Sequence, residues 1–454
     1  MMNRRTLMAA LMIAAAAGPA RAQERQRCTI NGSQQTNVKL PSGQYNSFMG
    51  GGVVARCPAR SVTLRADSLE SYGDEGRIFF LGKVHYEEPR LTLESDFLTY
   101  YQIDERIVAT GSVDARLPSG STMRGPFAEY QRVIPGRRPE PRLIATGRPT
   151  FHIVQRDTAA RDTLPTQVVA NAVTMVGDSL VYAGGQVEVT RTDVIARGDS
   201  VALDSQREIT VLMRGPSIEG KASRPFTLRG DRIELTGRDR KLSRVLSLGK
   251  ANAVSQDMTL ASDTIDLRVA EDLLQRAIAH GPSRAQARSS TQKIVSDSID
   301  VIMPGQRVSE VHAVRGAAAE GQPDTIRFRA DTVDWMRGDT IVARFDSTTR
   351  RDSAAAARMK EIVALGNAKS FYHLTPSDST QRKPAINYVT GREILVSFDS
   401  ARVSRVTVID QAAGVYLEPR AVRDTTRRDS TRVAPAANRA DTTARRPPTL
   451  SRLP

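Results

Sequence analysis

The sequence predicts an all-β fold, an elongated solenoid in which short strands stack along one axis. Two short motifs recur along most of the chain, and the apolar residues between them alternate with a period of two. A repeat of roughly 30 residues is typical of solenoids, and this alternation is typical of strands with one buried face. Single globular cores stop growing near about 250–300 residues, whereas a solenoid adds units that contact only their neighbours. The 454 residues therefore fit one long domain.

Each repeat has an opening and a closing half. The opening half is a small residue, Asp, Ser or Thr, and an apolar residue, first seen in Ala66–Leu69; the closing half is an apolar arm that ends on Gly, as in Arg106–Gly111. The closing glycines are Gly82, Gly111, Gly147, Gly185, Gly215, Gly249, Gly281, Gly316 and Gly366. We expect the Asp to form turns at corners between strands and the Gly to mark a bend or a close backbone approach.

The closing arms carry the strand period. Every second residue of one arm is small or apolar: Ile107, Ala109, Gly111, Val113 and Ala115. The arm Glu271–Ala279 has a helix-forming composition, but Arg276–Gly281 aligns residue by residue with the closing arm Arg106–Gly111. We therefore predict a strand here.

The two ends of the chain are expected to lie outside the repeat domain. Residues 1–22 have the pattern of a signal peptide, with a positive start, an apolar stretch and a small-x-small cleavage site at Ala20-Arg21-Ala22; a retained anchor is the alternative. The mature protein is then exported to the periplasm, where it is free or associated with the inner or outer membrane. Residues 420–454 are basic and poor in large apolar residues, which predicts a disordered tail.

Residues 23–60 form a lead-in segment before the repeat domain, which covers residues 61–419. The lead-in contains the only two cysteines, Cys28 and Cys57. In an oxidising compartment such a pair is expected to form a disulfide. Two polar stretches, residues 155–167 and 346–359, are expected to be loops inserted between repeats.

The net charge of +15 is unevenly distributed. The signal peptide contributes three arginines, and the tail contributes nine arginines against three aspartates, which leaves about +6 for the rest of the chain. Acidic and basic residues alternate there, and aromatic residues are few. This pattern predicts no nucleic-acid partner, because phosphodiester binding needs a basic stripe and base stacking needs aromatic side chains.

No catalytic motif is found in the sequence. The five histidines are scattered, and there is no Gly-x-Ser-x-Gly elbow and no phosphate-binding loop. We therefore assign no catalytic residue, no metal ligand and no cofactor, and predict that the protein is not an enzyme. A carbohydrate-active β-helix remains an alternative.

Five motifs follow one another in the first repeats: Ala66–Leu69, Phe80–Val84, Leu93–Tyr100, Val108–Val113 and Met123–Tyr130. Their ordered succession resembles the OstA-like family, whose members include the periplasmic bridge protein of lipopolysaccharide transport and the N-terminal domain of the outer-membrane translocon. The likeness is best over residues 61–153 and looser up to about residue 404. It implies an open, V-shaped β-jellyroll, a β-taco, whose apolar trough holds lipid acyl chains.

The resemblance implies a periplasmic lipid-binding bridge or carrier for lipopolysaccharide or a related glycolipid. It implies partners that pair with the terminal strands, either other envelope transport proteins or further copies of the chain. The residues expected to line the trough are Ile78, Phe80, Val84, Leu91, Leu93, Phe97, Ile107, Val113, Phe151 and Val187. The alternative is a scaffold solenoid of the envelope, filled by its own side chains and free of lipid.

Overall fold

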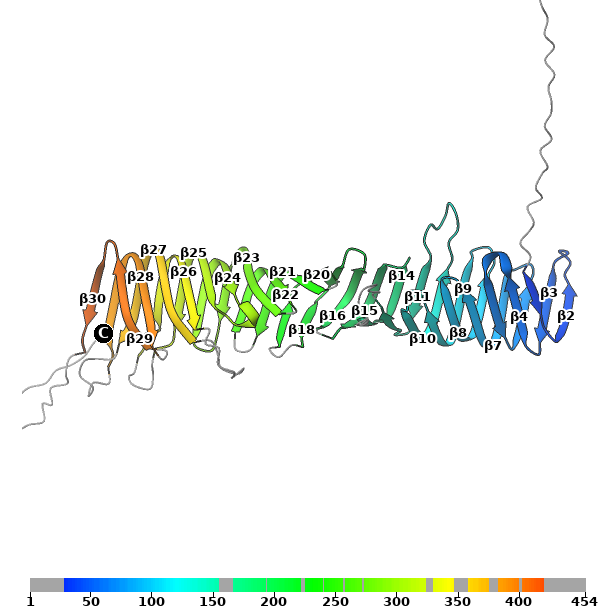
Figure 1. Cartoon of the computed structure of the whole chain (residues 1–454), viewed down its shortest axis with the longest axis horizontal. Helices are drawn as coiled ribbons and strands as arrows, with labels where there is room; N and C mark the ends of the chain where they lie inside the picture. Colours follow the sequence, from blue (N-terminus) through cyan, green and yellow to red (C-terminus); the bar gives the residue numbers. More distant parts are fainter. Residues whose placement is uncertain are drawn as a thin grey trace, which may run out of the picture.

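The computed structural model describes residues 28–154, 166–192, 194–221, 225–239, 241–255, 258–271, 273–323, 330–346, 358–374, 383–399 and 402–419. These residues form one antiparallel sheet of 30 strands in an elongated body (Figure 1). The predicted all-β fold is confirmed. The proposed signal peptide, residues 155–165 and 347–357 of the expected inserted loops, and the C-terminal tail lie outside the described residues. The other ends of those loops belong to strands.

Fourteen of the described strands run across the full width of the sheet. They are β7 (Arg77–Glu88), β8 (Leu91–Tyr101), β9 (Arg106–Arg116), β10 (Thr122–Gln131), β15 (Leu180–Thr190), β16 (Val194–Asp204), β21 (Lys241–Ser255), β22 (Met258–Ala270), β23 (Leu273–Arg288), β24 (Gln292–Ile302), β25 (Glu310–Gly321), β26 (Asp334–Asp346), β27 (Arg358–Leu374) and β28 (Ala385–Asp399). β23 covers most of the arm with helix-forming composition, so its assignment as a strand is confirmed.

Sixteen shorter described strands form eight pairs, and each pair crosses the sheet with a break in the middle. The pairs are β1 (Thr29–Asn31) with β2 (Gln34–Lys39), β3 (Tyr45–Gly50) with β4 (Val53–Cys57), β5 (Val62–Ala66) with β6 (Ser68–Tyr72), β11 (Arg142–Thr146) with β12 (Thr150–Ile153), β13 (Thr166–Val169) with β14 (Ala172–Val176), β17 (Ile209–Met213) with β18 (Ser217–Gly220), β19 (Phe226–Arg229) with β20 (Arg232–Arg238), and β29 (Arg402–Ile409) with β30 (Ala413–Leu417). The described chain thus crosses the sheet twenty-two times. At roughly 4.8 Å per strand, the sheet extends for about 100 Å.

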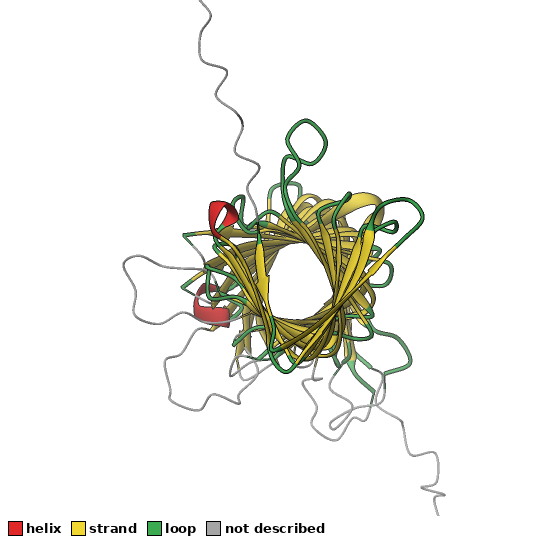
Figure 2. Cartoon of the chain, turned by 90° about the vertical axis from the view of Figure 1, so that its right-hand side faces the viewer, coloured by secondary structure: helices red, strands yellow, loops and turns green. Residues whose placement is uncertain are grey.

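The sheet is folded along its length into two walls that meet at a corner. On one side of β7, residues 77–81 pair with β6 and residues 85–87 pair with β5. On the other side, both halves of β7 pair with β8, and the register shifts between Leu81 and Val84. We call the wall that contains residues 77–81 wall A and the wall that contains residues 84–88 wall B. The two 3-10 helices, η1 (Pro58–Arg60) at a tip of wall B and η2 (Pro304–Gln306) at a tip of wall A, lie on the same side of the body (Figure 2). On this side, opposite the corner, the hairpin tips of the walls face each other across a mouth.

The corner is built from the two repeating motifs. All nine closing glycines have a positive φ, between 57° and 153°. At Gly111, with φ 98°, a Cβ atom would come 2.2 Å from a carboxylate oxygen of Asp96 on the neighbouring strand. That carboxylate accepts a hydrogen bond of 2.9 Å from the backbone N–H of Ser112. The recurring Asp therefore has a structural role at the corner.

The interior of the two walls is apolar, and nine of the ten predicted trough residues are buried in it. The exception is Phe97, whose side chain is 52% exposed; its prediction as an inward residue is wrong. β8 bends at Asp96, opposite the two residues Gly82 and Lys83 of β7, so the register shifts by one residue there. The shift moves Phe97 to the outer face and brings Leu98, 1% exposed, inside.

The predicted disulfide is confirmed, with an S–S distance of 2.00 Å between Cys28 and Cys57. It joins the segment before β1 to the end of β4, and these strands pair directly. Residues 29–57 therefore belong to the same sheet as the repeats that follow. The disulfide indicates an oxidising compartment. Among the described residues, no helix has the length and apolar composition needed to cross a bilayer.

Candidate functional site

A groove of about 600 Å³ lies between the walls in the C-terminal half of the described chain. This size is typical of ligand sites, which span roughly 300–1,000 Å³. Both walls contribute apolar side chains to it. The lining from wall B includes Phe226, Ala253, Met258, Leu260, Ala287 and Ile294. The lining from wall A and its tips includes Leu267, Leu274, Ala277, Val301, Met303, Val308, Val311, Phe345, Met359 and Phe398.

The position of the groove follows from the size of the inward side chains. Of the five aromatic side chains buried in the described residues, four precede residue 154: Phe80, Tyr86, Tyr130 and Phe151. Only Tyr372 lies in the C-terminal half. The inward positions of β23 are instead filled by Ala277, Ala279, Ala285 and Ala287. Protein interiors normally pack as densely as crystals of small organic molecules. The alanines of β23 leave space between the walls that larger side chains would fill.

The rim of the groove is cationic. Arg288 ends β23 on wall B, Arg358 begins β27 on wall A, and both line the groove with exposed side chains. Neither guanidinium forms an ion pair with any described residue. Ser289, Ser290 and Thr291 add hydroxyl groups beside Arg288, and none of the described residues that line the groove is acidic. An apolar trough with a cationic, hydroxyl-rich rim can accept a molecule that has a hydrocarbon part and an anionic part.

A second cavity of about 330 Å³ extends the groove toward the C-terminal end. The two cavities share the lining residues Thr291, Gln292, Ile294, Met359 and Phe398. The far end of this cavity is polar: the buried His373 lies with its Nδ1 atom 2.7 Å from Oδ1 of Asp334. Burial raises the pKa of the Asp334 carboxyl above its usual value, although the hydrogen bonds from His373 oppose this effect.

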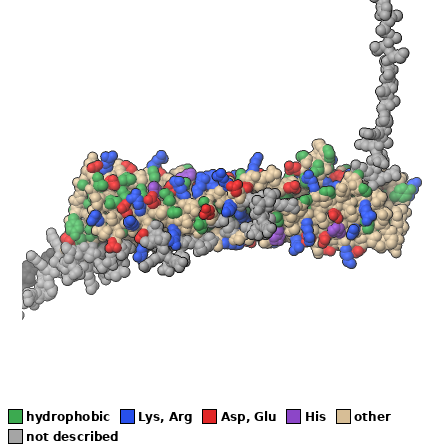
Figure 3. All heavy atoms as spheres, viewed as in Figure 1, with side chains coloured by type: hydrophobic (Ala, Val, Ile, Leu, Met, Phe, Trp, Pro, Cys, Tyr) green, Lys and Arg blue, Asp and Glu red, His purple; other side chains and the backbone are tan. Residues whose placement is uncertain are grey.

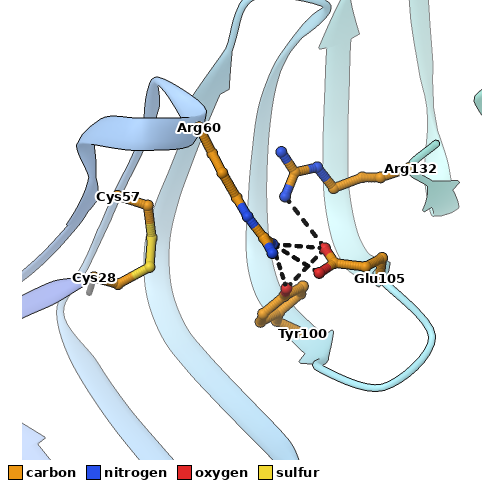
Figure 4. Close-up of a disulfide and its surroundings, with 6 residues drawn as sticks. All are labelled: Cys28, Cys57, Arg60, Tyr100, Glu105 and Arg132. Carbon is orange, nitrogen blue, oxygen red and sulfur yellow. Dashed lines mark hydrogen bonds and ion pairs between the residues drawn. A yellow bond between two sulfur atoms is a disulfide. The ribbon is translucent and has the colours of Figure 1, made fainter. Parts of the chain in front are cut away.

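The N-terminal part of the mouth is closed by an ionic cluster (Figure 4). Arg60, at a tip of wall B, donates hydrogen bonds of 2.7 and 2.9 Å from Nη1 to the two carboxylate oxygens of Glu105, at a tip of wall A. Arg132, which follows β10 on wall A, lies with Nε 3.0 Å from Oε2 of Glu88 on wall B. Nη1 of Arg132 is also 3.3 Å from Oε2 of Glu105. The cluster thus connects both walls.

Tyrosine hydroxyls complete the partners of the two carboxylates. Tyr86 donates to Oε2 of Glu88 at 2.8 Å, and Tyr100 donates to Oε2 of Glu105 at 2.9 Å. Burial and the neighbouring Glu88 raise the pKa of Tyr86 far above its usual value, and the same two causes raise that of Tyr130. The phenols therefore stay protonated, and both carboxylates have hydrogen-bond donors, Glu88 in a buried position and Glu105 in a half-buried one.

The guanidinium groups stay charged in this environment. Burial disfavours the charged form of Arg60, but the hydrogen bond and the charge of Glu105 outweigh it, so the pKa of Arg60 is raised. Burial likewise opposes the charge of Arg132, and the neighbouring carboxylates of Glu88 and Glu105 raise its pKa overall. Both cross-wall contacts are therefore interactions between opposite charges.

The predicted trough residues and the groove lie in different parts of the sheet. Ile78, Phe80, Val84, Leu91, Leu93, Ile107, Val113, Phe151 and Val187 are all at most 8% exposed, but none of them lines the groove. None of the residues that line the groove was predicted as a site residue by the sequence analysis. A sequence signal that could have pointed to part of the groove is the run of inward alanines in β23.

No protein-family model matches the sequence, and no curated protein is significantly similar to it. The function is therefore inferred from the groove, its rim and the fold.

Proposed function

We propose that this protein is a lipid carrier or bridge of the bacterial envelope, and that the groove between β19 and β28 holds the hydrocarbon chains. The observation that supports this most is the apolar groove of about 600 Å³, which both walls line and which Arg288 and Arg358 flank. Each methylene moved from water into such a groove contributes about 0.8 kcal/mol to binding. The arginines supply charge-assisted hydrogen bonds to an anionic headgroup at the mouth.

The fold and length of the protein fit transport across an aqueous space. A sheet about 100 Å long offers one continuous interior, and the disulfide is compatible with the periplasm. The likeness of residues 61–153 to the OstA-like family motivates lipopolysaccharide or a related glycolipid as cargo. Movement of a chain along a groove breaks no covalent bond, so the proposal needs no catalytic residue, metal or cofactor.

The two ends of the sheet support the proposed partners. All six residues of the edge strand β2 are exposed, and Val415, Tyr416 and Leu417 of the edge strand β30 are 52–55% exposed. Unpaired strand edges can add a strand from another chain. Envelope transport proteins or further copies of this chain are the proposed occupants of these edges.

A scaffold without lipid is the second candidate function. It is favoured by the N-terminal half, where the interior is filled by side chains such as Leu93 and Phe151, both fully buried. A scaffold would purify free of lipid and would not depend on the groove.

Photo-crosslinking and lipid extraction test the proposal. A photoreactive phenylalanine analogue at Phe345, inside the groove, is expected to crosslink to lipid in cells, whereas the same analogue at the outer-face residue Tyr182 is not. Extraction of the purified protein is expected to yield glycolipid in a stoichiometric amount. A protein that is free of lipid and crosslinks at neither position would contradict lipid transport and support the scaffold.

A further inference from the structure

We propose that Arg60, Glu88, Glu105 and Arg132 form a latch that holds the two walls together over the N-terminal part of the sheet. The latch confines a bound hydrocarbon chain to the C-terminal groove until it opens. This inference rests on the proposed lipid-binding function for the part that concerns lipid, whereas the closure of the walls can be measured without lipid.

The latch is reciprocal. Each wall contributes one base and one acid: Arg60 and Glu88 come from wall B, and Arg132 and Glu105 come from wall A. The contact between Arg132 and Glu105 joins the two cross-wall pairs into one network. Separating the walls at this point breaks both pairs together, which is the property expected of a closure between two bodies.

The latch contacts differ from ion pairs that stabilise one wall. Arg276 on β23 and Asp300 on β24, for example, join neighbouring strands of wall A at an exposed site. Such surface pairs contribute little to stability. Of the two cross-wall pairs, Arg132 with Glu88 is shielded from water, with side chains 17% and 5% exposed, whereas Arg60 with Glu105 is 42% and 21% exposed. Losing one partner of the Arg132–Glu88 pair in the closed arrangement leaves a buried, uncompensated charge, so the closed arrangement requires the acids and the bases together.

The closed section is filled by its own side chains. Behind the latch, the side chains of Phe80 and Leu93 are 3% and 0% exposed. A chain can enter only if the walls separate and their side chains exchange contacts with each other for contacts with the lipid. The hydrocarbon replaces apolar contacts with apolar contacts, but it cannot replace the charge pairs at the mouth. The ionic groups are therefore the part of the closure that lipid does not compensate.

The test compares the wild type with Glu88→Gln/Glu105→Gln, which removes both negative charges and keeps the shape of the side chains. The matched control is Asp300→Asn, which removes the acid of the exposed pair with Arg276. The distance between spin labels carried by non-natural residues at Arg90 and Ile103, the tips of walls B and A beside β8, reports closure directly. Ile103 is 78% exposed and Arg90 is exposed, so the labels are tolerated. The double variant is expected to shift this distance to longer values, and the control is not.

The lipid arm uses phosphatidic acid with a diazirine in its acyl chain, followed by mass spectrometric mapping of the labelled peptides. In the wild type and the control, label is expected around Met303 and Met359 and at background level in residues 77–116. In the double variant, the label in residues 77–116 is expected to rise to the level found at the groove. Near-UV circular dichroism and the intact disulfide show that the variant is folded.

Two results overturn the latch: label in residues 77–116 of the wild type equal to that in the groove, or a folded double variant with unchanged distance and unchanged labelling. A longer distance in the double variant without label at any position in any protein is a different result. It leaves the latch in place and contradicts the proposed lipid binding.

Discussion

Asp96 lies directly against Gly111 at the corner where the sheet folds. Space for a side chain is absent there, because a Cβ at Gly111 would lie 2.2 Å from a carboxylate oxygen of Asp96. The same contact recurs further along the chain, with Asn171 in place of the aspartate opposite Gly185. The recurrence explains why the two motifs of the repeat keep a fixed phase: the polar residue of one strand occupies the volume that the glycine of the next strand leaves free.

Gly185→Ala is expected to lower the free energy of unfolding by about 1–3 kcal/mol, because Gly185 has φ 76° and a Cβ there would lie 2.6 Å from Nδ2 of Asn171. The matched control is Gly184→Ala, one residue earlier in β15, where a Cβ would meet no atom within 4 Å. Denaturant unfolding measures both. Equal effects of the two substitutions would contradict the role assigned to the corner.

Ala287→Leu is expected to reduce lipid crosslinking from the groove while leaving the unfolding midpoint nearly unchanged, because the leucine fills existing space. Ala115→Leu is the matched variant. Ala115 and Ala287 are both the residue before the last one of their strand on wall B, and both are buried, but only Ala287 lines the groove. Overpacking at Ala115 is expected to cost about 1–3 kcal/mol of stability. Thermal unfolding and the photo-crosslinking assay distinguish the two; the reverse order of stabilities would show that the groove is already filled.

The sequence predicted the strands and their corners because both depend on near neighbours in the chain. Alternation along β7 correctly placed Phe80 inside. It failed at Phe97, because a bend at Asp96 changes which residues face inward and no residue type marks that change by itself. The segment Glu271–Ala279 was correctly predicted as a strand. Its composition favours a helix, but its alignment with the closing arm Arg106–Gly111 gave the right answer.

The open groove and the ionic closure could not be predicted from the repeat. The closure depends on side chains that meet across the mouth from different hairpin tips, and the groove depends on the sizes of inward side chains from many strands. Arg60 and Glu105 are 45 residues apart in the sequence. The periodicity fixes the position of each side chain on its own wall, whereas the contact between walls depends on the size of every inward residue around it.

Arg288→Glu combined with Arg358→Glu is expected to weaken binding of vesicle-derived phosphatidic acid, since each arginine supplies a charge-assisted hydrogen bond that contributes about 1.5–3 kcal/mol. The loss corresponds to roughly tenfold or more for each arginine. Arg124→Glu is the control, because Arg124 is 69% exposed and lies outside the groove. Binding is measured at two salt concentrations. An equal loss with Arg124→Glu would reveal a general effect of net charge rather than a rim site.

Asp334→Asn is expected to change the pH dependence of stability. Burial raises the pKa of Asp334 in the folded protein, so the folded state binds this proton more tightly than the unfolded chain does. The free energy of unfolding of the wild type, relative to that of the variant, therefore falls as pH rises from the ordinary Asp value of about 3.9 through the raised folded value, and is constant above it. Asn keeps an acceptor for Nδ1 of His373. Denaturant unfolding from pH 3.5 to 7 measures the difference, and a difference that grows with pH would refute the assignment.

Cys28→Ser/Cys57→Ser is expected to destabilise the N-terminal rungs rather than the whole sheet. The disulfide closes a loop of 29 residues, which corresponds to roughly 3–4 kcal/mol in the chain-entropy description. β1 pairs with β4 through only three residues, Thr29–Asn31, and each rung of a solenoid contacts only its neighbours. Hydrogen exchange should therefore become faster in β1 and β4, and near Arg60, which follows β4 directly, while β23–β27 keep their protection. Reductant should reproduce the effect in the wild type and change nothing in the double variant. Uniform loss of protection along the chain would show that the sheet unfolds as one cooperative unit, in which the latch at Arg60 and the groove cannot open separately.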